Sequence, residues 1–420
     1  MTAEVVVMNT KGVALAADSA VTIQGKKVYN SANKLFPLSE HHPVGVMVFG
    51  SAQFMNIPWE TIVKLYGRQL GNQEFDELED YADRFIDFLH DNDYPELMSL
   101  QDRELFTKDF LYAKIDSIHQ RCQHLHREIY FEYQDEKSLE EIQDIYTYRV
   151  EEWLRGLVMQ YQEKDFIPPF NELDFQDVTE KYTDPIIEYM KEHFTGYLLT
   201  ENLVSYVLMI TFNSLFKRFD EQYSGVVFAG FGKKELRPAA VTLHIERMIN
   251  GKLKYQKKPN EQGQIEVDNL GTIIGLAQKD MVMNFMTGIH EIMEESILTH
   301  LENNMEQLPG ILLEQLQDHF QPDTNLEKVG EMIRNELLRL YGDFHQKIYH
   351  SKLEYFIQPT MDIVGALPIN ELAEMAEMLV NMTSFKRKIS DSLETVSDPI
   401  DVAVITKHEG FIWVKNKQGV

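Results

Sequence analysis

The chain has 420 residues, enough to bury one large core or two smaller ones. Its composition, 44% hydrophobic and 25% charged, is typical of a globular protein and argues against disordered and fibrous classes. The net charge of -27 argues against binding to nucleic acid or to an anionic membrane, both of which need a basic surface.

A cytoplasmic protein is expected. No apolar run reaches the roughly 18 residues that a membrane span requires, and the N-terminus lacks the basic and apolar segments of a secretory signal. Cys122 is the single cysteine, so no disulfide can form within the chain, which fits a reducing compartment.

The first fifty residues predict three strands. Residues 3–8 are rich in valine, residues 9–12 supply turn residues and residues 13–17 resume an apolar run, which together indicate a hairpin. Residues 43–50 form an apolar run bounded by proline and glycine, which indicates a buried strand.

The pattern then changes to helices and back to strands. A helical period runs from about residue 59 to residue 216. Strand character returns at residues 225–230 and 239–245, and the Asn-Gly pair at 250–251 indicates another hairpin.

A second helical block spans about residues 279–390, and a strand, turn and strand follow at residues 400–414. Prolines are expected to interrupt this block near Pro309, Pro322 and Pro359. Strands at both ends with helices between them predict an α+β fold, in which helices pack on antiparallel sheets.

Three polar residues near the N-terminus suggest chemistry. The hydroxyl of Thr2 is a weak nucleophile, but once Met1 is removed the α-amine of Thr2 can act as its base. Such an amine has an ordinary pKa of about 7.7–8.0, against about 10.4 for lysine, so it is more readily neutral near pH 7. A charged Lys34 would lower the proton affinity of the amine, and Asp18 would orient the lysine.

These residues are evenly spaced, with 16 positions from Thr2 to Asp18 (18 − 2) and 16 from Asp18 to Lys34 (34 − 18). The spacing, with the motifs LAADSAVT and SANKLFPL, resembles that of proteasome β-subunits and of a bacterial-type proteasome-related protein. The resemblance implies the αββα sandwich of N-terminal-nucleophile (Ntn) hydrolases. It covers under half of the chain. We expect a single domain over residues 1–420, with helical insertions at 74–200 and 290–370.

The resemblance also implies roles for further residues. Gly50 would contribute its backbone amide to the oxyanion hole, and the backbone of Thr22 would pair with an extended substrate. Glu394 and Ser397 would support the nucleophile, although glutamate stands where the family has aspartate. Val21 and Val46 are candidates for an apolar substrate pocket and equally for the core.

Two departures from the family pattern concern supporting groups. A serine of the family falls near Leu276, and an arginine falls at Ala20. The resemblance implies a threonine peptidase that cleaves peptides or unfolded proteins and forms homo-oligomers, without a cofactor. An inactive proteasome-like scaffold or binding module and an Ntn amidase for a small molecule remain alternatives.

A metal site is the rival hypothesis. His119, Cys122 and His126 recur at helical i, i+3, i+7 spacing and would share one face. Their neighbours are those of a solvated helix, so no metal is expected.

Overall fold

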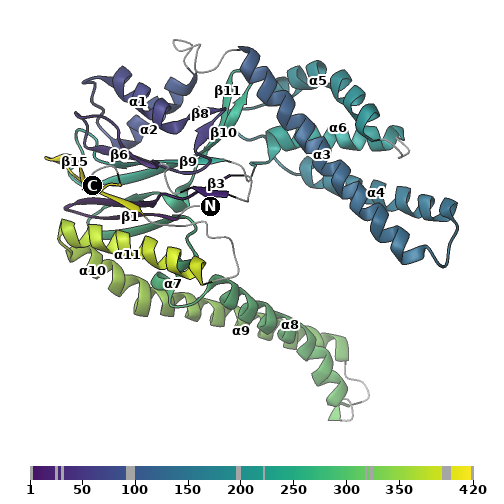
Figure 1. Ribbon diagram of the computed structural model, residues 1–420. Coiled ribbons are helices and arrows are strands. Elements are labelled where there is room, and N and C mark those ends of the chain that lie inside the picture. Colours follow the sequence, from purple (N-terminus) through teal and green to yellow (C-terminus); the bar gives the residue numbers. More distant parts are fainter. Residues whose placement is uncertain are drawn as a thin grey trace.

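The protein is a stack of two antiparallel sheets with helices on both outer faces and two helical arms (Figure 1). The computed structural model describes residues 3–23, 27–29, 33–90, 100–194, 200–220, 223–316, 319–321, 325–389 and 399–417. These layers confirm the predicted α+β class with two antiparallel sheets.

The first sheet has the order β13-β1-β2-β14-β15. Its strands are β1 (Ala3–Asn9), β2 (Gly12–Asp18), β13 (Gly271–Ala277), β14 (Ile400–Thr406) and β15 (Gly410–Lys415). The predicted hairpin at the N-terminus is confirmed, with Asn9 opposite Gly12 and Glu4 opposite Ala17.

The second sheet has the order β11-β10-β9-β6-β5, with β12 also paired to β10. Its strands are β5 (Leu35–Pro37), β6 (Val44–Gly50), β9 (Ser224–Gly230), β10 (Ala239–Ile249), β11 (Lys252–Lys257) and β12 (Gly263–Gln264). Asn250 and Gly251 both have positive φ, 47° and 78°, as the predicted turn between β10 and β11 requires. Two short hairpins lie outside these sheets: β3 (Val21–Ile23) with β4 (Lys27–Tyr29), and β7 (Gln53–Phe54) with β8 (Ile57–Pro58).

Alternation along the strands builds three apolar layers. In β1, Val6 and Met8 face the second sheet, whereas Val5 and Val7 face the helices beneath the first sheet. The outer helices over the second sheet are α1 (Trp59–Leu70) and α2 (Leu78–His90), and those under the first are α7 (Asp280–Thr287), α10 (Gln358–Ala366) and α11 (Ile369–Lys388).

The upper arm has an apolar core of its own. It consists of α3 (Leu100–Tyr133), α4 (Leu139–Gln162), α5 (Glu172–His193) and α6 (Glu201–Lys217). Ile249, at the end of β10, is buried among these helices and ties the arm to the second sheet.

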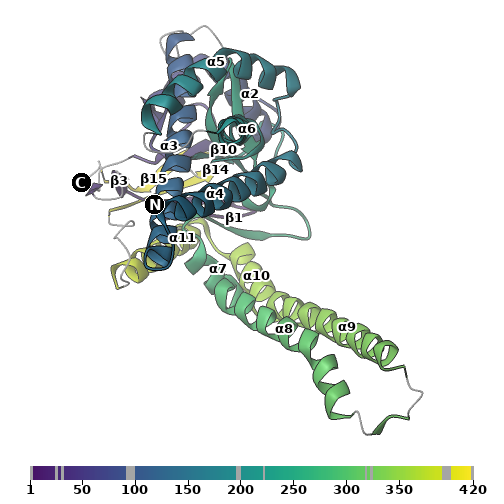
Figure 2. The same ribbon diagram turned by 90° about the vertical axis from the view of Figure 1, so that its right-hand side faces the viewer.

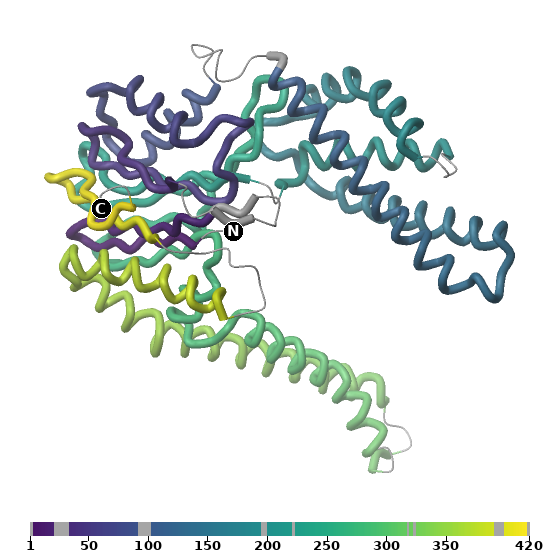
Figure 3. The backbone as a smooth tube through the Cα atoms, in the orientation of Figure 1, coloured from purple at the N-terminus to yellow at the C-terminus, as the bar shows by residue number. Residues whose placement is uncertain are grey.

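The lower arm is a helical hairpin of α8 (Glu291–Gln315) and α9 (Leu326–Lys352), joined to α10 by a π-helical turn (Leu353–Ile357). Both arms leave the core on the side where β1 begins (Figures 1 and 2), and the tube view shows the same relation (Figure 3). No helix in the described ranges is long and apolar enough to cross a membrane.

The expected interruption at Pro309 is wrong, because α8 continues through this residue. Proline removes one backbone donor from a helix, and here the buried ring lies inside the helical arm, where packing outweighs that loss. Near Pro359 the helix is not broken either: α9 passes through the π-helical turn into α10, and Pro359 lies in the first turn of α10. Pro322 lies outside the described residues.

Candidate active site

The centre of the candidate site is a buried ion pair that joins the two sheets. Lys34 Nζ lies 2.8 Å from Asp18 Oδ1, and the residues are 5% and 1% exposed. Asp18 ends β2 of the first sheet. Lys34 directly precedes β5 of the second sheet, where its carbonyl accepts a hydrogen bond from the Val48 amide at 2.8 Å.

Three donors fix the Asp18 carboxylate. Besides Lys34, the amide of Ala3 donates to Oδ1 at 3.0 Å and the amide of Ala20 donates to Oδ2 at 3.0 Å. The Ala3 nitrogen is covalently joined to Thr2, so the chain next to the expected nucleophile is bonded to the same carboxylate as Lys34. Hydrogen bonds to a charged carboxylate are stronger than those between neutral groups and fix its orientation.

Burial lowers the pKa of Lys34 below its ordinary value, and the nearby carboxylates of Asp18 and Glu4 oppose that shift. The lysine therefore releases its proton more readily than an exposed lysine. Removing either residue of such a pair destabilises the fold, because the remaining charge is then buried without a partner.

Gly50 ends β6 two residues beyond Val48, at the same end of the second sheet as Lys34. Its φ is +79°, and a Cβ at this position would lie 2.4 Å from the carbonyl oxygen of Tyr223. The backbone here therefore requires glycine.

Replacing Gly50 by alanine should cost about 1–3 kcal/mol of unfolding free energy through backbone strain, with a further loss from the clash. It should also lower amide hydrolysis by about 10²-fold if the Gly50 amide stabilises an oxyanion. Gly71→Ala is the matched control, because Gly71 has φ +55° and an added Cβ would meet nothing within 4 Å. Chemical denaturation and initial rates measure both effects. Equal activity in the two variants would remove Gly50 from the oxyanion hole.

The structure describes only some of the other predicted site residues. Thr2, Glu394 and Ser397 lie outside the described residues. Thr22 and Val21 belong to β3, where Thr22 lies opposite Val28, and only their backbone is described. Their predicted roles stay predictions.

Val46 is fully buried, together with Phe36, in the layer between the second sheet and α1 and α2. It therefore faces away from Met47, which points toward the first sheet. The structure does not bring its side chain beside the Asp18–Lys34 pair, and its role in a substrate pocket stays a prediction.

Sequence reasoning missed Glu4, which is 1% exposed. Both of its carboxylate oxygens lack a hydrogen-bond partner within the described part of the chain. The signal was a single charged residue in the otherwise apolar run of β1.

It also missed a second buried pair near Asp18. Lys417 Nζ lies 3.1 Å from Asp401 Oδ2 and donates to the hydroxyl of Ser19 at 3.0 Å. Nothing in the local sequence could connect Ser19 with a residue near the other end of the chain.

A polar cluster crosses from the second sheet toward the end of β13. His244 Nε2 lies 2.7 Å from Glu261 Oε2, and the imidazole stacks on Tyr223 with ring centroids 4.1 Å apart. Lys279, just beyond β13, reaches Glu261 at 3.7 Å. The signal for His244 was the alternation along β10, in which Thr242, His244 and Glu246 share one face.

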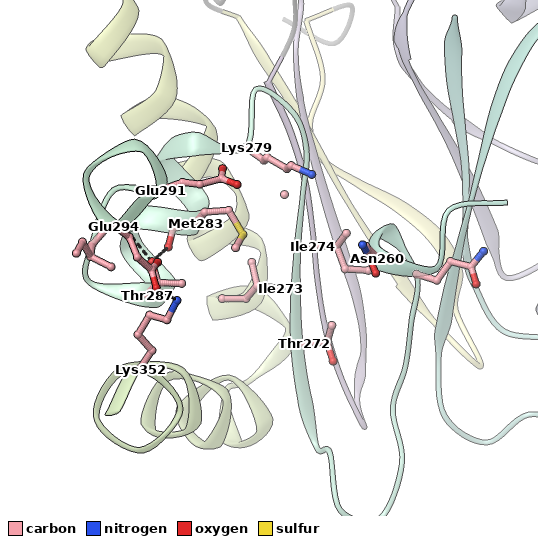
Figure 4. A pocket seen from close by; sticks show the side chains of 13 residues that line it. Asn260, Thr272, Ile273, Ile274, Lys279, Met283, Thr287, Glu291, Glu294 and Lys352 are labelled. Atoms are coloured by element: carbon pink, nitrogen blue, oxygen red, sulfur yellow. Dashed lines mark hydrogen bonds and ion pairs between the residues drawn. The ribbon is translucent and has the colours of Figure 1, made fainter. Parts of the chain in front are cut away.

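A pocket of about 490 Å³ opens beside this cluster, between β13 and the base of the lower arm (Figure 4). Thr272, Ile273 and Ile274 line it from β13, Lys279 lies at the end of that strand, and Met283 lies across from Ile273. The pocket lies on β13, which pairs with β1, and neither Asp18 nor Lys34 lines it.

The histidines proposed as the rival metal site have aromatic neighbours. The ring of His119 stacks on Phe194 at 4.3 Å, and that of His126 meets Tyr146 edge-on at 5.1 Å. Cys122 is buried, which raises the pKa of its thiol to about 11 and disfavours the thiolate that binds metals. Within the described ranges, no group of three or more His, Cys, Asp or Glu residues could hold a metal ion.

The chain matches no protein-family model and no curated protein sequence. Among solved structures, it is similar to a Gly-1 mutant of Anbu from Hyphomicrobium sp. strain MC1, at 10% identity and a TM-score of 0.32 over 99% of this chain and 86% of that one. Two others are the helical assembly of the Anbu complex from Pseudomonas aeruginosa and Anbu, described as an ancestral β-subunit, from Yersinia bercovieri. Each has 9% identity and a TM-score of 0.28, over 99% of this chain and 88% of the other. Values this low establish neither a shared activity nor a shared site.

Proposed function

We propose that the chain is an Ntn hydrolase that cleaves peptide bonds with Thr2 as its nucleophile after Met1 is removed. The observation that supports this most strongly is the buried Asp18–Lys34 pair bonded to the Ala3 amide, the nitrogen next to Thr2 in the chain. Apolar residues could fill a sheet interior as well, and Lys254 and Glu246 form another buried pair. What sets the Asp18–Lys34 pair apart is its hydrogen bond to the backbone nitrogen next to Thr2.

In the proposed reaction, Thr2 Oγ attacks the substrate carbonyl carbon and its proton passes to the α-amine. The ammonium of Lys34 lowers the proton affinity of that amine, so that the amine is neutral and able to accept the proton. The amine then protonates the leaving nitrogen, and water hydrolyses the acyl-enzyme. The Gly50 amide would stabilise the oxyanion.

Peptides are the proposed substrates. β3 carries Thr22 near this site and is paired on one side with β4, in a hairpin outside the two main sheets. An extended peptide that adds to the backbone around Thr22 would use the same hydrogen-bonding pattern as a strand. Self-assembly of the chain is part of the same proposal, and mass photometry measures it.

The test compares one protein before and after exposure of its N-terminus. A version with an N-terminal extension should be inactive on an unstructured peptide, because its Thr2 has no free amine. Removing the extension with a site-specific protease, so that Thr2 becomes the first residue, should restore turnover. Equal activity before and after removal would overturn the mechanism. Hydrolysis of acylated small amines but not of peptides would favour the amidase, and no hydrolysis in either state would favour the scaffold.

A further inference from the structure

Glu4 is the buried carboxyl group that the proposed mechanism does not use. On the adjacent strands it lies opposite Ala17 of β2 and Leu276 of β13, and neither side chain carries a charge or a hydroxyl. Alternation along β1 places Glu4 on the face of Val6 and Met8, toward the second sheet.

The described lysines that act on Glu4 directly or through each other already have carboxylate partners. Lys34 lies against Asp18 at 2.8 Å, and Lys417 lies against Asp401 at 3.1 Å. The charged groups that influence Glu4 most are Lys34 and Asp18, and Lys417 acts on Lys34 in turn. Lys34 is bonded to Asp18, and the carboxylate oxygens of Glu4 have no hydrogen-bond partner in the described part of the chain.

An unpaired carboxylate is costly inside a protein, and taking up a proton removes that cost. Burial accordingly raises the pKa of Glu4 well above its ordinary value, Lys34 opposes the shift, and Asp18 adds to it. An ionised Glu4 would also attract the ammonium of Lys34 away from Asp18. The Ala3 amide is bonded to the same Asp18 carboxylate.

We propose that Glu4 is a positioning residue, a carboxylic acid held neutral so that Lys34 pairs with Asp18 alone. Ionisation of Glu4 as the pH rises would pull Lys34 toward a second carboxylate and lower the rate. This role in catalysis rests on the proposed function, whereas the neutral state of Glu4 does not.

The linked effect on stability has a definite sign. Because the pKa of Glu4 is higher in the folded chain than in the unfolded one, the folded chain holds more protons above about pH 4.5. Its stability should fall as the pH rises from there toward the folded pKa. Glu4→Gln is near-isosteric with the neutral acid and should lack this fall.

The experiment compares wild type with Glu4→Gln and with a control, Glu246→Gln. Glu246 is a buried glutamate whose oxygens are bonded to Lys254 at 2.9 Å and Arg247 at 2.8 Å. Difference infrared spectra at pH 7 should show a carboxylic acid band that is lost in Glu4→Gln and kept in Glu246→Gln. The Tm of Glu4→Gln minus that of wild type should increase as the pH rises. Glu246→Gln should be less stable than wild type at neutral pH.

Activity tests the positioning role separately. Glu4→Gln should keep kcat/KM within about threefold at neutral pH and retain it to higher pH than wild type. Absence of the acid band, a Tm difference independent of pH, or more than a tenfold loss at neutral pH would overturn the inference. If the wild type hydrolyses nothing, the proposed function fails, and the infrared and Tm measurements still decide whether Glu4 is held neutral.

Discussion

Lys34→Met should lower kcat/KM for peptide hydrolysis by about 10³-fold, because the reaction loses the cation that keeps the Thr2 amine neutral. Among the described residues, the same change leaves the buried Asp18 carboxylate with the Ala3 and Ala20 amides as its donors. Loss of one partner of such a buried pair costs about 3–5 kcal/mol of unfolding free energy. The two effects must be separated, so rates are measured at a temperature where circular dichroism shows the variant folded.

The chain supplies a matched control at a distance from the site. Lys254 Nζ lies 2.9 Å from Glu246 Oε2, and both side chains are 0% exposed. Lys254→Met should therefore lose a similar amount of stability and keep its activity while folded. If both folded variants lost activity equally, the effect of Lys34 would be structural. If folded Lys34→Met kept its activity, the lysine would have no part in the chemistry.

Thr2→Ala should abolish hydrolysis, with a loss of more than about 10³-fold, because no hydroxyl remains to attack the carbonyl. Thr2→Ser is the paired variant, since it keeps both the hydroxyl and the α-amine and should retain turnover. The measurement is single-turnover kinetics with a chromogenic peptide, together with the Tm of each variant.

Comparable activity in Thr2→Ala and the parent chain would exclude Thr2 as the nucleophile, whatever the role of Lys34. Equal loss in Thr2→Ala and Thr2→Ser would point to the methyl group or to a folding defect, and the Tm values distinguish these.

Apolar runs bounded by turn residues predict most of the strands. The hairpin of β1 and β2 and the strand β6 are local patterns, so the sequence predicts them without knowledge of the tertiary fold. The chemical roles assigned to Asp18 and Lys34 predict that the two residues pair, and Lys34 Nζ lies 2.8 Å from Asp18 Oδ1.

Features that depend on packing between distant parts of the chain are harder to predict from the sequence. Pro309 reads as a helix break by its local chemistry, but the helix that contains it continues. In the sequence, Glu4 is a single charged residue in an apolar strand. Its importance becomes visible only in the structure, where Lys34 and Lys417 are already paired with Asp18 and Asp401. Ser19 and Lys417 form a hydrogen bond although 398 positions separate them in the sequence, and no local pattern predicts such a contact.

Intact mass after treatment with an electrophile selective for N-terminal threonine tests the central claim most directly. The purified chain should lack Met1 and gain the mass of one adduct, and fragmentation should place that adduct on Thr2. Lys34→Met should react more slowly, whereas Lys254→Met should react like the parent chain. A chain that hydrolyses peptides while it retains Met1, or that carries its adduct on a residue other than Thr2, would contradict the proposed mechanism.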